Sequence, residues 1–142
     1  MRQFAHLHLH TEFSLLDGMG RINDYMTRAR EYGMQHLAVT DHGVMYGVVD
    51  WYKAARANDL HPILGIEAYL APNSISERDK SSYHLLLLAE NERGYSNLLK
   101  LASRASLDGF YYKPRVDLDM LNEMRDGVIA TSACLGGPVA NN

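Results

Sequence analysis

Polar and apolar residues alternate one by one at the start of the chain. Over residues 4–9, histidines alternate with alanine and leucine. A strand has a side-chain period of two, so this pattern predicts a strand over residues 4–9 with His6, His8 and His10 projecting from one face. A row of buried, unpaired imidazoles costs desolvation energy, and a bound metal ion removes that cost. The alternative is a solvated edge strand that carries histidines.

Apolar runs and amphipathic stretches follow one another along the rest of the chain. The runs predict further strands over residues 36–40, 62–70, 84–89 and 128–131. Apolar residues at spacings of three and four predict helices over residues 22–32, 47–58, 92–105 and 118–124. The polar segment 71–82 has turn residues and charges without a period, which predicts a loop.

Three residues mark the expected ends of helices. Gly33 suits the position just past a helix, where glycine takes the left-handed conformation without strain. Asn91 and Asp117 suit the position just before a helix, because their side-chain oxygens can accept hydrogen bonds from the first turn.

Strands that alternate with helices indicate an α/β fold with βα units and a mostly parallel sheet or barrel. The connection between the strands at 62–70 and 84–89 lacks a helix signal. Either these strands form an antiparallel pair, or a strand boundary is wrong by a few residues. We expect one domain over residues 1–142. About five strands fall short of the eight strands and about 250 residues of a typical barrel, so we expect an incomplete, N-terminal part of something larger.

Composition is that of an ordinary globular protein outside the membrane. Hydrophobic residues make up 46% and charged residues 22% of the chain, and no apolar run could span a bilayer. One cysteine and the lack of a signal peptide predict a reducing, cytoplasmic location. A net charge of −3 without a basic block argues against passive coating of nucleic acid. A nuclease remains possible, because metal ions can supply the positive charge.

Potential metal ligands gather where predicted strands end, which is where parallel α/β folds place their chemistry. The candidates are His8, His10, Asp17, His42, Glu67, His84 and Cys134. His84 is the exception, because it opens its strand. Nitrogen, oxygen and thiolate donors together suit zinc, or manganese or iron where carboxylates dominate. Seven donors exceed the needs of one tetrahedral ion, so we expect two or three ions, a cluster suited to cleaving phosphate esters.

Ordered motifs give the chain a family resemblance. They are H-L-H-T-E-F-S-L-L-D-G, A-V-T-D-H-G, P-I-L-G-I-E-A-Y, K-P-R and S-A-C-L-G-G. Together they resemble the polymerase-and-histidinol-phosphatase (PHP) domain family, in the branch found at the N-terminus of bacterial replicative DNA polymerase III alpha subunits. The resemblance runs through the whole chain. It implies a distorted TIM-like (βα)7 barrel, incomplete here, with a trinuclear metal site on one rim.

The resemblance assigns ligands to the first two metals. His8 and His10 resemble ligands of the first metal. Glu67 resembles the acid that bridges the first and second metals. His84 and Cys134 resemble the other ligands of the second metal.

The third metal and the catalytic centre follow from the same resemblance. Asp17 and His42 resemble ligands of the third metal. Glu67, His10 and His42 are therefore the expected catalytic residues. The family completes the first and third sites with an Asp-x-His pair near the end of the domain, and we expect this chain to end before that pair.

The resemblance also implies a function. It predicts a phosphoesterase or 3′–5′ proofreading exonuclease that uses divalent ions such as Zn, Mn, Mg or Fe. The partners would be the 3′ end of a primer strand and the other subunits of a replicative DNA polymerase, with no membrane. Two alternatives stay open: a stand-alone phosphoesterase for a small ester such as histidinol phosphate, and a non-catalytic structural module. The polymerase palm, fingers and thumb are absent, so this chain alone is not expected to copy DNA.

The aromatic and basic stretch D-G-F-Y-Y-K-P-R offers candidate substrate contacts. Lys113 and Arg115 could clamp a substrate phosphate, with bidentate contacts from the arginine, or could lie on a solvated loop. Tyr111 and Tyr112 could stack on an unpaired base. For both tyrosines we favour burial.

Other polar residues are given structural roles. Asp41 could be a ligand, but orienting His42 or capping the next turn is the preferred interpretation. His6 is expected to pack or to face solvent. His36 and His61 open their strands, away from the ligand-bearing ends, and are expected to be structural.

Overall fold

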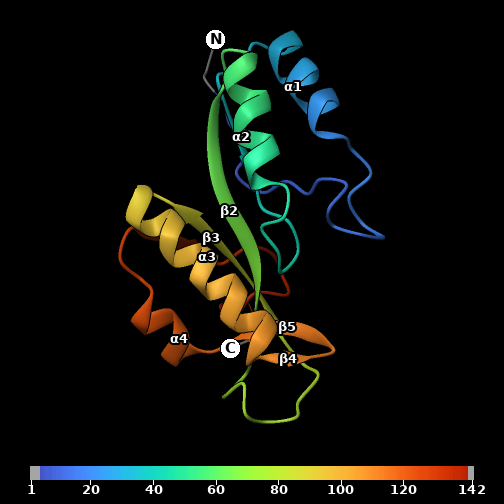
Figure 1. The fold of residues 1–142 in the computed structure, drawn as a ribbon. Coiled ribbons are helices and arrows are strands. Elements are labelled where there is room, and N and C mark those ends of the chain that lie inside the picture. Colours follow the sequence, from blue (N-terminus) through green and yellow to red (C-terminus); the bar gives the residue numbers. More distant parts are fainter. Residues whose placement is uncertain (1–3, 141–142) are drawn as a thin grey trace.

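A mixed β-sheet runs the length of the protein, and the computed structural model describes it over residues 4–140 (Figure 1). The strands are β1 (His36–Val39), β2 (His61–Leu70), β3 (Tyr83–Ala89), β4 (Phe110–Tyr111), β5 (Lys113–Val116) and β6 (Val128–Thr131). The helices are α1 (Ile22–Glu31), α2 (Val48–Ala57), α3 (Glu92–Leu107) and α4 (Leu118–Glu123). Within the described residues, no helix has both the length and the apolar character needed to cross a membrane.

The long strand β2 joins the two halves of the sheet. Its first half pairs in parallel with β1, and its second half lies between antiparallel β3 and parallel β5. The main path of the sheet is β4-β5-β2-β3-β6, and it is not closed over the described residues. The fold is therefore α/β with a mixed sheet, and the prediction of a mostly parallel sheet is wrong.

β2 and β3 form an antiparallel pair, which is the first of the two alternatives left open for the helix-free connection between them. Tyr69 of β2 lies opposite His84 of β3. The start of one strand thus lies beside the end of the other, as antiparallel geometry requires. His84 consequently reaches the same edge of the sheet as the residues that end the other strands.

The predicted helices are confirmed to within a few residues. α1 is followed by Gly33, whose φ of 67° is the left-handed conformation expected there. The Asn91 side chain accepts a hydrogen bond from the Gly94 backbone N–H at 3.0 Å. The Asp117 side chain does the same for the Met120 N–H at 3.1 Å, so both predicted caps are present.

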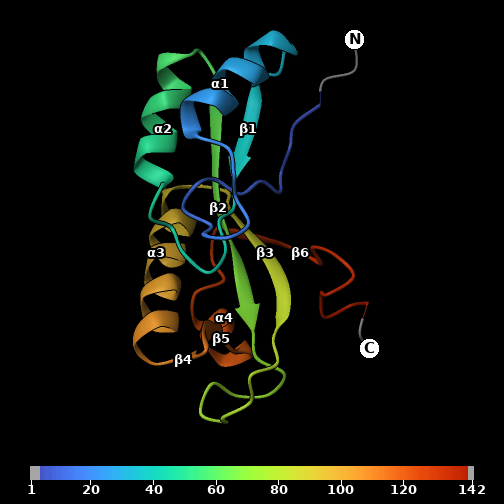
Figure 2. The ribbon, with the colours of Figure 1, turned by 90° about the vertical axis from the view of Figure 1, so that its right-hand side faces the viewer.

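The helices cover one face of the sheet (Figure 2). Met26 of α1, Trp51 of α2 and Leu98 of α3 are completely buried in one core cluster. Burying each such side chain contributes about 1.5–3 kcal/mol. The core thus lies between the helices and the sheet, and the opposite face is left to other segments.

Alternation along β2 directs two kinds of side chain to its two faces. Ile66, Ala68 and Leu70 belong to the core cluster. Because successive side chains of a strand point to opposite faces, Glu67 and Tyr69 project away from that cluster. This alternation aims a carboxylate at the face that the helices do not cover.

The segment predicted as the first strand does not form one. Residues 4–9 make a single isolated bridge, His6 opposite Leu37. The backbone oxygens of His6 and Leu9 each accept a hydrogen bond from the β1 side at 2.9 Å. The Leu9 N–H donates to the side-chain hydroxyl of Thr40. A side chain thus replaces the backbone acceptor that a regular β-ladder would supply. The segment is held beside β1 without becoming part of a regular ladder.

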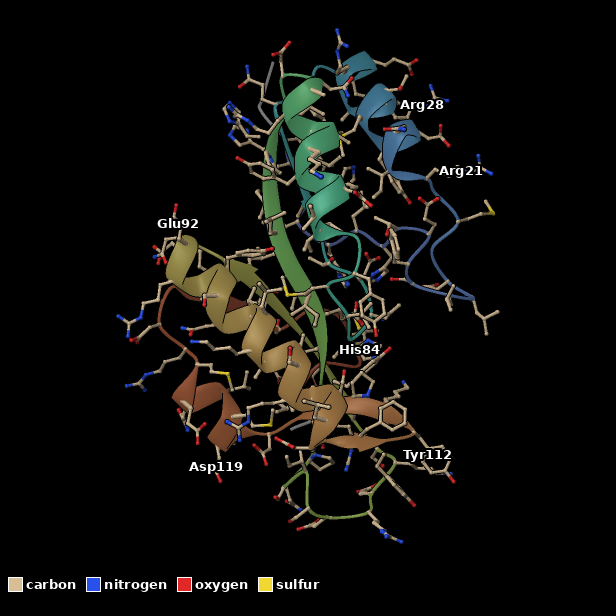
Figure 3. All side chains as sticks on the ribbon, viewed as in Figure 1. Arg21, Arg28, His84, Glu92, Tyr112 and Asp119 are labelled. Atoms are coloured by element: carbon tan, nitrogen blue, oxygen red, sulfur yellow. The ribbon has the colours of Figure 1, made fainter. Side chains whose placement is uncertain are left out.

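The stretch that follows α3 contains two short strands that the apolar pattern did not predict. β4 and β5 form a tight antiparallel hairpin, and Tyr112 turns the chain with a φ of 60°. The Tyr112 side chain is 74% exposed at the outer edge of the molecule (Figure 3). The expected burial of Tyr112 is therefore wrong, because the turn points its ring away from the sheet.

Candidate metal centre

Glu67 is the centre of a cluster of polar side chains. The residue is only 1% exposed. Its backbone also fixes the turn after β1. The Glu67 N–H donates to the backbone oxygen of Asp41 at 3.1 Å, and the Gly43 N–H donates to the backbone oxygen of Glu67 at 2.9 Å. These bonds form an isolated parallel bridge between His42 and Glu67. A buried acid thus lies directly beside the T-D-H-G turn.

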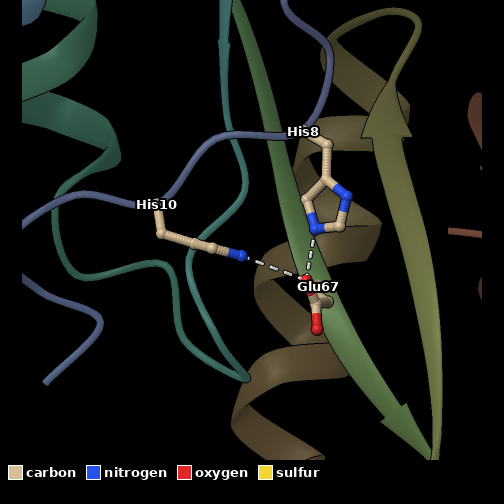
Figure 4. A group of neighbouring side chains, drawn as sticks. All are labelled: His8, His10 and Glu67. Atoms are coloured by element: carbon tan, nitrogen blue, oxygen red, sulfur yellow. Dashed lines mark hydrogen bonds and ion pairs between the residues drawn. The ribbon is translucent and has the colours of Figure 1, made fainter. Parts of the chain in front are cut away.

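Four imidazoles surround the Glu67 carboxylate. His8 Nε2 makes a short contact with Oε2, and His10 Nε2 lies 3.2 Å from the same oxygen. Figure 4 shows both rings directed at the carboxylate from the N-terminal segment. On the other oxygen, His84 Nδ1 lies at 3.0 Å and His42 Nδ1 at 3.3 Å. Three separate segments of the chain therefore meet at one acid.

Two further donors extend the cluster in opposite directions. The Asp17 carboxylate lies 2.7 Å from His42 Nε2. The Cys134 sulfur lies 3.5 Å from His84 Nδ1 and also accepts the Gly136 N–H at 3.3 Å. The structure thus brings all seven residues predicted as ligands into one continuous group.

The geometry and the hydrogen-bond inventory of this group fit a divalent cation. Ligand atoms of His8, His10 and Glu67 lie within 4.8 Å of one another, and so do those of His10, Asp17 and His42. Within residues 4–140, His10 Nδ1, His42 Nδ1 and Glu67 Oε1 are buried and have no hydrogen-bond partner. The contacts of Glu67 Oε1 with His42 at 3.3 Å and His84 at 3.0 Å lack hydrogen-bond geometry. Buried polar atoms are normally satisfied. Cations would satisfy these lone pairs, because imidazole and carboxylate are common zinc donors.

The protonation equilibria point the same way. Burial by itself raises the pKa of Glu67, but the imidazoles of His10, His42 and His8 next to its carboxylate outweigh burial and hold that pKa well below its usual range. Glu67 beside His42 raises the pKa of the imidazole against the opposing effect of burial, and Asp17 adds to the increase. The hydrogen bond to His42 in turn lowers the pKa of Asp17. Both carboxylates therefore favour their ionised form, which is the form that attracts a cation.

A row of parallel rings leads from the cluster to a lysine. The rings of His10 and His42 stack at 4.0 Å, and the Tyr69 ring lies nearly parallel to His42 at 6.1 Å. The Lys113 ammonium lies 4.3 Å from the Tyr69 ring centre. Tyr69 was not among the sequence candidates, although its place two residues after Glu67 puts it on the same face.

Arg115 does not face the cluster, which corrects the expectation that it clamps a phosphate. Its guanidinium is buried and donates to the backbone oxygens of Gly109, Ile75, Glu77 and Asp79 at 2.8–3.2 Å. Carbonyl groups of the 71–82 loop therefore occupy the donors that a phosphate would need. Arg115 anchors that loop.

The remaining histidines lie outside the cluster. The His6 ring packs edge-on against Phe4 at 4.8 Å. His36 and His61 stack on each other at 4.9 Å where β1 and β2 begin. Their positions agree with the structural roles expected for them.

Sequence comparison identifies relatives of this chain over nearly its whole length. The family profile described as "PHP domain" matches residues 6–142. The DNA polymerase III subunit alpha of Borreliella burgdorferi is 50% identical over 140 residues, which cover 95% of this chain and 12% of that protein. Those of Helicobacter pylori and Thermus aquaticus are each 47% identical over 97% and 96% of this chain. The chain spans about 12% of the length of these relatives.

Comparison of folds identifies two solved structures. A protein from Bifidobacterium adolescentis, named as a metal-dependent phosphoesterase, has a TM-score of 0.54 and 23% identity over 74% of this chain and 34% of its own. An amidohydrolase from Chromobacterium violaceum has a TM-score of 0.51 and 22% identity over 72% of this chain and 34% of its own. These likenesses establish a shared fold.

Proposed function

The chain belongs to the PHP domain family, and from this premise we propose that it is a metal-dependent phosphoesterase domain that removes nucleotides from the 3′ end of DNA. In this proposal it acts within a bacterial DNA polymerase III alpha subunit, in the cytoplasm, together with the other replicative subunits. The names of the relatives support the polymerase context. The observation that carries the proposal is the convergence of four imidazoles on the buried Glu67 carboxylate.

We propose that the centre holds three divalent ions. His8, His10 and Glu67 would hold the first, and Glu67 would share the second with His84 and Cys134. The third would lie in the group of His10, Asp17 and His42, whose ligand atoms are within 4.8 Å of one another. Further strands of the parent protein would complete a (βα)7 barrel and supply the family's Asp-x-His donors from near the end of the domain.

Divalent ions bound there would supply Lewis acidity to a phosphoryl group and lower the pKa of a bound water. The protein's own contribution is rigidity and charge. Glu67 stays ionised and holds its ring of imidazoles, while the stack of His10 on His42 fixes two ligands as a unit. The Lys113 ammonium, held over Tyr69, would attract the substrate phosphate.

The relatives favour DNA over a small metabolite as the substrate. The proteins that match nearly the whole chain at 47–50% identity are named as DNA polymerase III alpha subunits. Among the alternatives, we therefore favour DNA as the substrate.

The test is hydrolysis by the full-length parent protein loaded with Zn²⁺ or Mn²⁺. A 5′-labelled single-stranded oligonucleotide should be shortened from its 3′ end, and Lys113→Met should slow this about tenfold while bound metal stays constant. Hydrolysis of histidinol phosphate without cleavage of DNA would support the small-ester alternative. A folded protein that binds no metal and cleaves neither substrate would support the structural alternative.

A further inference from the structure

Asp41 is a buried carboxylate next to a proposed ligand, yet the hydrogen bonds of its side chain go to the 11–14 turn. It is 1% exposed. One of its oxygens accepts hydrogen bonds from the Thr11 N–H at 2.6 Å and the Ser14 hydroxyl at 2.7 Å. The other oxygen accepts from the Thr11 hydroxyl at 2.8 Å. Its hydrogen-bonding capacity is thus turned to the 11–14 turn, so the alternative that Asp41 is itself a ligand has no geometric support.

These bonds tie together the segments that carry three proposed ligands. Thr11 directly follows His10 and starts a turn that leads to Asp17. In this turn, the Asp17 N–H donates to the backbone oxygen of Ser14 at 3.1 Å. The Ser14 hydroxyl also accepts the His42 N–H at 3.1 Å. Asp41 and Ser14 therefore connect the backbones of all members of the His10, Asp17 and His42 group.

Among the described residues, none forms an ion pair with the buried carboxylate of Asp41. Within residues 4–140, no ion pair joins Asp41 to a lysine, arginine or histidine, and its described partners are neutral N–H and O–H groups. A buried carboxylate without a cation is costly. The turn bound to Asp41 follows His10 and contacts the His42 backbone, and both histidines belong to the proposed metal centre, so an ion bound there would supply a positive charge near Asp41.

We propose that Asp41 is a positioning residue of the metal centre that binds no ion itself. It fixes His10, Asp17 and His42 in register through Thr11 and Ser14, and its negative charge favours a cation in that group. This inference rests on the metal binding proposed above. Asp41 would act on the ions by the electrostatic effect of its charge and by the hydrogen bonds that hold the turn.

The test uses Asp41→Asn, which removes the charge and can keep the hydrogen bonds. The amide oxygen can still accept from the Thr11 N–H and from Ser14, and the amide NH₂ can donate to the Thr11 hydroxyl. Residues that orient metal ligands affect affinity about 10–100-fold. We therefore expect competition titrations of Zn²⁺ or Mn²⁺ against a chelator to show a Kd for the His10, Asp17 and His42 ion at least about tenfold weaker. The thermal midpoint of the metal-free variant should not fall.

The matched control is Asp117→Asn, which also changes a buried aspartate bonded to backbone N–H groups, but at the start of α4. It should leave the metal Kd unchanged. Ser14→Ala provides a second variant in case Asp41→Asn does not fold, and it should weaken the same ion by cutting the link to His42. An unchanged Kd in the variant that folds, or a lower metal-free midpoint with an unchanged Kd, would overturn the inference. Failure of the unmodified protein to bind any ion would instead overturn the proposed function, and this inference with it.

Discussion

Two pairs of stacked histidines in this protein have nearly the same ring geometry and very different surroundings. His36 and His61 stack at 4.9 Å with 22° between the ring planes, and His10 and His42 stack at 4.0 Å with 19°. The first pair is exposed at the beginning of β1 and β2. The second pair lies against Glu67, which is 1% exposed. Stacking therefore does not distinguish a metal site from a surface pair.

The difference lies in what satisfies the lone pairs. Water can hydrogen-bond the exposed rings of His36 and His61. In the part of the chain that the structure describes, His10 Nδ1 and His42 Nδ1 are buried without a hydrogen-bond partner beside an ionised acid. Such groups are costly unless a cation joins them. The buried carboxylate, more than the number of histidines, marks the place where metal should bind.

Removing that carboxylate should have the largest effect. Glu67→Ala removes the carboxylate whose two oxygens contact four imidazoles, so it should release at least two ions at once. We expect a loss of affinity of more than about a hundredfold, beyond the range of residues that only orient ligands. Elemental analysis after dialysis measures the stoichiometry. The exposed loop substitution Glu77→Ala is the control, and an unchanged stoichiometry in Glu67→Ala would refute the bridging assignment.

Removing the ions should have the next largest effect. Ligand that binds only the folded state stabilises it by about 2.7 kcal/mol at a concentration of 100 Kd. For a chain of this size, chelation should lower the thermal midpoint by roughly 5–10 °C. Scanning calorimetry with and without a chelator measures the shift. A midpoint that does not respond to chelation would mean that the cluster is stable without metal.

A smaller effect should follow from loss of the thiol. Within the described residues, Cys134 contacts the cluster at His84, which in turn contacts Glu67, so Cys134→Ala should weaken one ion about 10–100-fold. The ion held by His10, Asp17 and His42 should keep its affinity. Isothermal titration with Zn²⁺ resolves the two classes of site. Equal weakening of both classes would contradict this division of ligands.

The smallest effect is expected at the exposed pair. His61→Ala removes one of the two stacked rings outside the centre, so metal stoichiometry and affinity should stay unchanged. Surface substitutions of this kind alter the free energy of unfolding by less than about 0.5 kcal/mol. Chemical denaturation and metal titration provide the measurements. A loss of bound metal in His61→Ala would erase the contrast between the two pairs.

The sequence predicted the donors of the cluster better than the backbone that carries them. Ordered motifs pointed to His8, Glu67, His84 and Cys134, and the structure brings these residues together. The strand expected over residues 4–9 is absent, because side-chain alternation shows which side chains share a face but not whether a neighbour supplies a full ladder.

Residues that act through tertiary contacts were beyond what spacing could show. Thr11 and Ser14 are small polar residues between two proposed ligands, and only the fold reveals that Asp41 binds both. Arg115 looked like a phosphate ligand because its motif is basic. Its burial depends on the 71–82 loop folding back over it, a long-range contact that a local pattern does not contain.

The change of partners along β2 has a consequence for how the protein unfolds. Glu67 lies just past the point where β2 leaves β1 and joins β3. His10 and His42 reach it from the β1 side, whereas His84 and Cys134 reach it from the β3 side. Ions bound between these residues would link the β1 side of the sheet to the β3 side. Loaded protein should then melt as one cooperative unit, and stripped protein should let one half loosen before the other.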